Sequence, residues 1–241
     1  MARINMTPAS DLFKWKQFQP DIIHLCTRWY LRYSLTYRGL VEMMAERGLS
    51  MAHTTIMRWV HQYSPELDKR TRSHHRPSGD SWKVDETYLK IKGKWMYLYR
   101  AVHKEGATID FYLSAHRDQL AAARFLKKAL GADHNTIPRA INVDKNASYP
   151  PAVESAKDAG YLPDETDLRQ VKYLNNRVEC DRRRIKRLIK HSIAFKDFWS
   201  AHRTIRGYET MYMIRKGQVK LADDSYLEQV KFIENIFGIA A

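Results

Sequence analysis

The stretch from residue 81 to residue 114 constrains the fold more than any other part of the chain. Its letters, SWKVDETYLKIKGKWMYLYRAVHKEGATIDFYLS, are rich in aromatic and β-branched residues and are interrupted by KGK and KEGA. This composition, with short glycine-containing turns, predicts three antiparallel strands that follow one another as a meander.

The segments after the meander alternate between helical and extended patterns. The pattern predicts a helix at 118–132, a strand at 138–144, a helix at 151–162, a strand at 169–173, and helices at 176–190 and about 196–216. Strands that are reached through helices suit a mixed α/β sheet flanked by helices.

The N-terminal region predicts three amphipathic helices, at residues 18–33, 36–47 and 52–63. Gly48 follows the second helix, as is typical of helix ends, and the whole outlines a helix-turn-helix unit. In the third helix, Ile56, Trp59, Val60 and Tyr63 share one face by their spacing. The opposite face carries side chains that can bind phosphates or base edges: His53, Thr54, Thr55, Arg58 and Gln62. A helical bundle without a DNA role is the alternative.

These patterns predict four parts: a helix-turn-helix DNA-binding domain at 1–63, a basic linker at 64–80, a catalytic domain at 81–217 and a helical tail at 218–241. The linker is expected because residues 64–80 are polar and basic and contain two prolines and a glycine. The tail has helical periodicity, and it could pack on its own chain or pair with a second subunit.

The charge of the chain favours a polyanionic partner. Its 241 residues carry a formal charge of +14 and give a pI near 9.7, which suggests nucleic acid or an acidic membrane surface. The sequence contains neither a run of about 18 apolar residues nor a secretory signal, so we expect a cytoplasmic protein without a membrane partner. Cys26 and Cys180 are too few for a disulfide framework.

Three acids stand where a metal site could form. Asp85 lies within the first predicted strand, Asp144 at the carboxyl end of the fourth, and Glu179 at the start of a late helix. If these two strands are neighbours, the acids come together at the edge where ligands bind in open sheets. Carboxylates without histidine or cysteine suit Mg²⁺ or Mn²⁺, and two such ions about 3.5 to 4 Å apart would promote phosphodiester chemistry.

Each of these acids also has a structural interpretation. Glu86 or Asp110 could be the ligand in place of Asp85. Glu179 could simply form ion pairs with the basic residues that follow it on the helix, among them Arg182 and Arg183.

Several motifs together resemble the DDE transposases of bacterial insertion sequence family six, over nearly the whole chain from about Phe13 to Val219. They are TYRGLVEMMAERGL, HTTIMRWV, KVDETYLKIKGKWMYLYRAV, INVDKNASYPPAV, RQVKYLNNRVECDRRRIKR and HRTIRGYETMYMIRKGQ. The 34 residues between Asp144 and Glu179 are similar to the D,D(34)E spacing of that family.

The resemblance implies an RNase H-like fold, divalent metal at Asp85, Asp144 and Glu179, and cleavage at terminal inverted repeats followed by attack of the freed 3′ hydroxyl on target DNA. It also implies replicative movement through a cointegrate and a homodimer or larger assembly on double-stranded DNA in the bacterial nucleoid. Lys186 matches the basic position that contacts DNA ends in such enzymes, with Arg182 and Arg183 as further DNA contacts.

The chain departs from the family at two places. Cys180, Asp181, Arg182 and Arg183 stand where many relatives have Gln-Asp-His-Arg, and Ala194 replaces a common glycine. These departures bear on the level of activity more than on the type of reaction.

Three alternatives remain at this point: a DNA-binding regulator without catalysis, a Mg²⁺-dependent nuclease on the same fold, and a tyrosine recombinase. The last is disfavoured because none of the ten histidines begins a His-x-x-Arg motif. The run WMYLY at residues 95–99 is interpreted as strand core rather than as a base-stacking surface, and Ser148 and Tyr149 as loop residues near the site.

Overall fold

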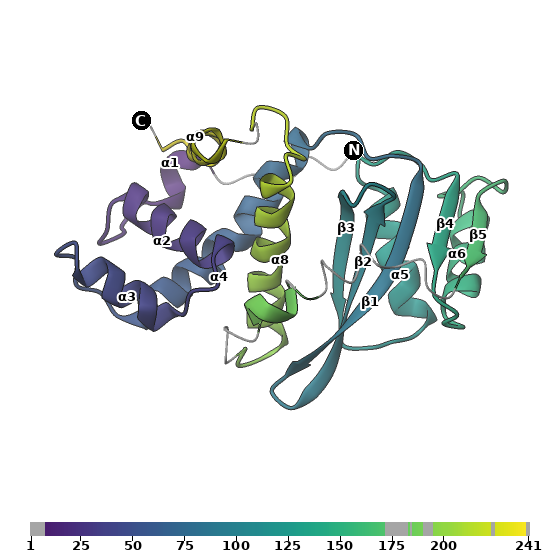
Figure 1. The fold of residues 1–241 in the computed structure, drawn as a ribbon, viewed down its shortest axis with the longest axis horizontal. Coiled ribbons are helices and arrows are strands. Elements are labelled where there is room, and N and C mark those ends of the chain that lie inside the picture. Colours follow the sequence, from purple (N-terminus) through teal and green to yellow (C-terminus); the bar gives the residue numbers. More distant parts are fainter. Residues whose placement is uncertain (1–7, 172–182, 184, 190–194, 223–224, 240–241) are drawn as a thin grey trace. The chain divides into compact units, whose positions relative to one another are not determined.

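The computed structural model describes residues 8–171, 183, 185–189, 195–222 and 225–239 (Figure 1). The chain divides into two compact units, the first made of Met1–His74 and Arg203–Ala241 and the second of His75–His202. Residues 203–217, expected at the end of the catalytic domain, therefore belong to the same compact unit as the N-terminal helices.

The second unit is built on a five-stranded sheet with the order β3-β2-β1-β4-β5. The strands are β1 (Ser81–Ile91), β2 (Lys94–His103), β3 (Thr108–Ser114), β4 (Ala140–Val143) and β5 (Asp167–Gln170). β1, β2 and β3 form the expected antiparallel meander, while β4 and β5 run parallel to β1. This confirms a mixed α/β sheet of RNase H-like topology with flanking helices.

The β1–β2 hairpin extends beyond the rest of the sheet (Figure 1). β1 and β2 pair as far as Ile91 opposite Lys94, whereas the pairing of β2 with β3 stops at Tyr97. The turn uses Lys92 and Gly93, both at positive φ (48° and 79°), as two-residue hairpin turns require.

Helices α5 (Gln119–Leu130) and α6 (Tyr149–Asp158) cover one face of the sheet. Asp118 caps α5 by accepting a hydrogen bond from the Ala121 amide at 2.8 Å. Phe125 of α5 stacks on Tyr99 of β2 with ring centroids 5.9 Å apart, and burying such a side chain contributes about 1.5 to 3 kcal/mol.

The first unit contains the predicted N-terminal helices. They are α1 (Ala9–Leu12), α2 (Pro20–Arg32), α3 (Tyr37–Ala45) and α4 (His53–Thr71). Thr36 caps α3 by accepting a hydrogen bond from the Gly39 amide at 3.0 Å, and Gly48, at φ 74°, turns the chain toward α4. The predicted core face of α4 is confirmed, because Ile56, Trp59, Val60 and Tyr63 are all buried.

The linker predicted to begin at Ser64 does not begin there. α4 continues through Pro65 to Thr71, and a 3₁₀ turn follows at Arg72–His74. Proline inside a helix costs about 3 kcal/mol, and tertiary contacts offset this cost: Arg206 lies 2.6 Å from the buried Asp68 carboxylate, and Arg70 donates a hydrogen bond to the Ile236 carbonyl at 2.9 Å.

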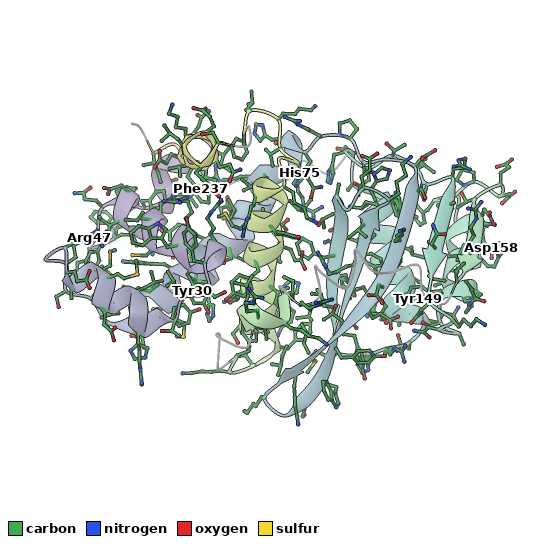
Figure 2. The ribbon with its side chains drawn as sticks, in the orientation of Figure 1. Tyr30, Arg47, His75, Tyr149, Asp158 and Phe237 are labelled. Carbon is green, nitrogen blue, oxygen red and sulfur yellow. The ribbon has the colours of Figure 1, made fainter. Side chains whose placement is uncertain are left out.

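Helices α8 (Phe198–Arg215) and α9 (Tyr226–Ile236) follow. The tail packs against its own chain in the first unit: the Arg32 guanidinium donates a hydrogen bond to Gln229 of α9 at 2.8 Å, and the ring of Phe237 lies against that of His24. Phe237 is labelled in Figure 2. Among the described helices, none combines the length and the apolar composition that crossing a lipid bilayer requires.

Candidate active site

Asp85 lies on β1, and Asp144 directly follows β4. β1 and β4 are neighbours and run parallel, with Lys83 opposite Asn142. Asp85 and Asp144 each lie two residues beyond this pair, toward the carboxyl ends of the two strands. The strands that carry the two acids are therefore neighbours, as expected.

The environments of the two acids differ. Asp85 is 3% exposed, and its cross-strand neighbour on β2 is the equally buried Arg100. Opposite charges in directly opposed strand positions stabilise a sheet. Asp144 is half-buried, and its Oδ1 accepts a hydrogen bond from the Asn146 amide at 3.1 Å, which shapes the loop after β4.

Glu86, an alternative to Asp85 as a metal ligand, has a different set of partners. It is 2% exposed and points to the opposite face of the sheet, the face of Val84 and the main core. Its Oε2 accepts a hydrogen bond from Arg117 Nε at 2.8 Å, and its Oε1 accepts one from Asn146 Nδ2 at 2.8 Å. Glu86 thus joins β1 to the loop that carries Asp144.

Asp110, the other alternative, is also buried rather than solvated. Its Oδ1 lies 2.6 Å from Lys128 Nζ of α5 and accepts a hydrogen bond from the Phe111 amide at 2.7 Å. These contacts give Asp110 a structural role in holding α5 on the sheet.

Tyr149, labelled in Figure 2, lies within electrostatic reach of two acids of β1 and of the acid that follows β4. It is the first residue of α6 and fully buried, not the loop residue that the sequence suggested. Burial is the main cause of its raised pKa, and the carboxylates of Glu86, Asp144 and Asp85 raise that pKa further. Two acids of β1 and the acid that follows β4 therefore act electrostatically on one hydroxyl.

The basic helix that follows is described in part. Glu179 and Arg182 lie outside the described residues. Residues 183 and 185–189 are helical, with Ile185 and Leu188 buried and with Arg183 and Lys186 exposed one turn apart. Two of the predicted DNA contacts thus share an accessible helix face.

The DNA contacts predicted on α4 lie on its accessible side. His53, Arg58 and Gln62 are exposed, and Thr54 and Thr55 are half-buried. Gln62 already accepts a hydrogen bond from Lys16 Nζ at 3.0 Å.

The donor set fits a hard divalent cation. Asp85 and Asp144 supply carboxylate oxygens, which Mg²⁺ and Mn²⁺ prefer. Within the described ranges, no three His, Cys, Asp or Glu side chains form a metal-binding group. Glu179, the predicted third ligand, is outside those ranges.

Sequence reasoning missed several residues of the site. Asn146 could have been noticed from its place two residues after the acid that ends a strand. Arg117 follows β3 without a motif, and its link to Glu86 depends on the folded sheet.

Comparison with known proteins identifies the family of the chain. Residues 79–218 match a family model described as "DDE domain". The transposase for insertion sequence-like element IS431mec from Staphylococcus aureus is 36% identical over 206 residues, which cover 86% of this chain and 89% of that protein. The transposase for insertion sequence element IS257 in transposon Tn4003, also from S. aureus, is equally similar, with 36% identity over 206 residues.

Among solved structures, the HTLV-2 integrase catalytic core domain in complex with magnesium (trimeric form) aligns with a TM-score of 0.43 and 14% identity, over 55% of this chain and 84% of that one. By its family model and by these relatives, the chain belongs to the DDE transposases of bacterial insertion sequence family six, which are polynucleotidyl transferases.

Proposed function

We propose that the protein binds the terminal inverted repeats of an insertion sequence, cleaves the DNA at the 3′ ends of the element and joins those ends to target DNA, with a replicative cointegrate as the product. The observation that carries this proposal is the parallel pairing of β1 with β4, because Asp85 and Asp144 each lie two residues beyond the Lys83–Asn142 pair. Family membership supplies the reaction class.

In this proposal Asp85, Asp144 and Glu179 are the catalytic residues and hold Mg²⁺ or Mn²⁺, with two ions in each site. When bound, two such ions activate the attacking oxygen and stabilise the leaving oxygen of an in-line phosphoryl displacement. The role of the chain is to hold the three carboxylates in position.

Two bond exchanges make up the reaction. Water first attacks a phosphodiester at the element end, which breaks the P–O3′ bond and leaves a 3′ hydroxyl on the element. That hydroxyl then attacks a target phosphodiester, forms a new P–O3′ bond and releases a target 3′ hydroxyl. The second step conserves the number of phosphodiester bonds, so it needs no external energy source.

Basic residues position the DNA. Lys186 and Arg183, exposed on one helix face, suit contacts with phosphates next to the reacting bond, and Arg182 joins them. The exposed side of α4, with His53, Arg58 and Gln62, reads the terminal repeat together with Thr54 and Thr55.

The assembly that acts on DNA is a homodimer or larger, because two element ends require two active sites. We place it in the bacterial cytoplasm on the nucleoid, where its double-stranded DNA partners lie.

The test uses the full chain with DNA that carries the inverted repeats flanking its gene. In Mg²⁺ or Mn²⁺ the wild-type protein should nick the element ends and give covalently joined donor and target. Asp144→Asn and Glu179→Gln should abolish nicking, whereas both variants should still shift the repeat DNA in a gel.

Two results would contradict the proposal. Nicking without any joined product would identify a nuclease on the same fold. Full function of both variants in vivo would identify a DNA-binding regulator that uses no carboxylate chemistry.

A further inference from the structure

The β1–β2 hairpin carries exposed aromatic side chains on the face that also bears Glu86. Tyr88 is 41% exposed and Trp95 56% exposed, and Tyr97 is half-buried. The register sets Tyr88 opposite Tyr97 and Lys90 opposite Trp95. Because alternate residues of a strand share a face, these side chains lie together on one side of the hairpin.

The rings form a preorganised array. Tyr88 meets Tyr97 at 5.4 Å between centroids with an interplanar angle of 75°, and meets Trp95 at 6.5 Å and 88°. These edge-to-face arrangements are favourable for aromatic pairs, so the rings need little reordering before they bind a ligand.

Cations flank the rings. Lys90 Nζ lies 5.8 Å from the Trp95 ring centre, and Arg117 Cζ lies 5.3 Å from that of Tyr88. Arg117 is held in turn by Glu86 at 2.8 Å. The contact between Arg117 and Tyr88 therefore connects the ring array to the network that holds the Asp144 loop.

The array lies close to Glu86 and to Asp144. Burial is the main cause of the raised pKa of Tyr88. Arg117 lowers this pKa, and the carboxylates of Glu86 and Asp144 raise it further. A strand whose phosphate meets Asp144 would bring its neighbouring bases within reach of these rings.

The expectation that residues 95–99 are strand core holds for part of this run and fails at its start. Met96, Leu98 and Tyr99 are buried, but Trp95 is exposed. Scattered exposed apolar residues are normal in proteins. Three adjacent rings flanked by cations are instead typical of surfaces on which the bases of single-stranded nucleic acid stack.

Charge complementarity identifies the occupant. Lys90, Lys92 and Lys94 are all exposed around the hairpin tip, which suits a polyanionic strand better than an apolar protein partner.

We propose that Tyr88, Trp95 and Tyr97 form a stacking platform for an unpaired nucleobase of the DNA strand at the active site, with Lys90 meeting its backbone. This inference rests on the proposed function, since it takes DNA as the substrate. The platform favours DNA whose end is opened, and so couples strand separation to positioning of the reacting phosphate.

The test measures DNA binding rather than catalysis. The full chain, in buffer with EDTA, is titrated into a blunt duplex and into the same duplex with a short single-stranded extension that contains 2-aminopurine. The wild-type protein should bind the extended duplex more tightly and quench the 2-aminopurine. Trp95→Ala and Tyr88→Ala should each weaken that binding roughly tenfold and relieve the quenching.

Matched controls are present in the same unit. Tyr161 is 40% exposed with Lys127 Nζ 5.3 Å from its ring centre, and Trp199 is 65% exposed. Tyr161→Ala and Trp199→Ala should leave both affinities unchanged, while Trp95→Phe, which keeps a ring, should retain most of the preference. Thermal melting of each variant shows that it is folded.

Three outcomes would overturn the inference. The first is that the wild type binds the two duplexes with equal affinity. The second is that Tyr161→Ala weakens binding as much as Trp95→Ala does. The third is that Trp95→Ala changes the oligomeric mass measured by light scattering, which would identify the rings as a protein interface. If the wild type bound neither duplex at low salt, the proposed function would fail as well.

Discussion

Glu86 on β1 accepts a hydrogen bond from Asn146, two residues beyond Asp144, at 2.8 Å. Asn146 Oδ1 in turn accepts a hydrogen bond from the Ser148 amide at 3.1 Å. A buried carboxylate on the core face of β1 thus fixes the loop that presents an acid to the candidate metal site.

Asn146→Ala should therefore impair the site without removing a ligand. Residues that orient metal ligands typically change metal affinity or activity by about 10- to 100-fold, so we expect the Mn²⁺ concentration for half-maximal 3′-end nicking to rise by about tenfold. Single-turnover nicking across a Mn²⁺ series measures this shift.

The control for this prediction is Asn135→Ala. Asn135 donates a hydrogen bond to the Ala129 carbonyl at 2.8 Å, away from the site. It should lower stability and leave the Mn²⁺ dependence as in the wild type. If the two variants gave the same Mn²⁺ dependence, Asn146 would have no positioning role.

Lys186→Ala tests the proposed phosphate interaction of the basic helix. When a lysine no longer neutralises a phosphate, the plot of log affinity against log salt concentration becomes less steep by about 0.9. The variant should therefore bind repeat DNA more weakly, and its plot should be less steep than that of the wild type by about one. Fluorescence anisotropy over a salt series measures it. Lys231→Ala removes an exposed lysine that pairs with Glu228 at 3.0 Å, and an equal change in its slope would argue against a specific role for Lys186.

The sequence predicted the elements better than it predicted where they end. Periodicity identified the meander and the core face of α4 because side-chain alternation is a local property. It missed the continuation of α4 past Ser64, because the contact that stabilises this part joins Asp68 to Arg206, 138 residues away. No local pattern contains that information.

The site shows the same limit. Asp144 was identifiable because a strand ends before it. The roles of Glu86 and Arg117 were not identifiable, because the hydrogen bond between them spans 31 residues and depends on the fold that brings the segment after β3 to β1. The stacking array likewise requires the register that pairs Tyr88 with Tyr97.

Gly207→Ala should destabilise the first unit. A Cβ at this position of α8 would lie 2.5 Å from Ser64 Oγ and 2.7 Å from Leu31 Cδ2, closer than packed atoms allow. Forcing an extra methyl group into a packed core costs about 1 to 3 kcal/mol. Urea unfolding followed by circular dichroism measures this decrease in stability.

Gly39→Ala is the matched change on another helix. Its Cβ would meet Thr36 Oγ1 at 3.4 Å, an ordinary contact. Because alanine favours helices over glycine by about 0.5 to 1 kcal/mol, this variant should be as stable as the wild type or more stable. A Gly207→Ala protein as stable as Gly39→Ala would contradict the close approach of α8 to α4 and α2.

His24 should make the first unit sensitive to mild acid. Burial, with a further contribution from Arg28, lowers its pKa from 6.5 to about 3. Between these values the unfolded chain binds a proton that the folded chain does not, so stability rises with pH across this window and falls on acidification. From pH 7 to pH 5 this single group should remove about 2 kcal/mol of unfolding free energy.

His24→Phe isolates this contribution. The substitution keeps a ring against Phe237, whose centroid lies 5.2 Å from that of His24, and it removes the titrating group. Urea unfolding gives the unfolding free energy of both proteins at pH 7 and at pH 5. In the difference between the variant and the wild type at each pH, the contributions of all other titrating groups cancel. The stability of His24→Phe relative to the wild type should increase by about 2 kcal/mol at the lower pH. A pH-independent difference would show that His24 titrates alike in the folded and unfolded chain, and so that its buried position against Phe237 is wrong.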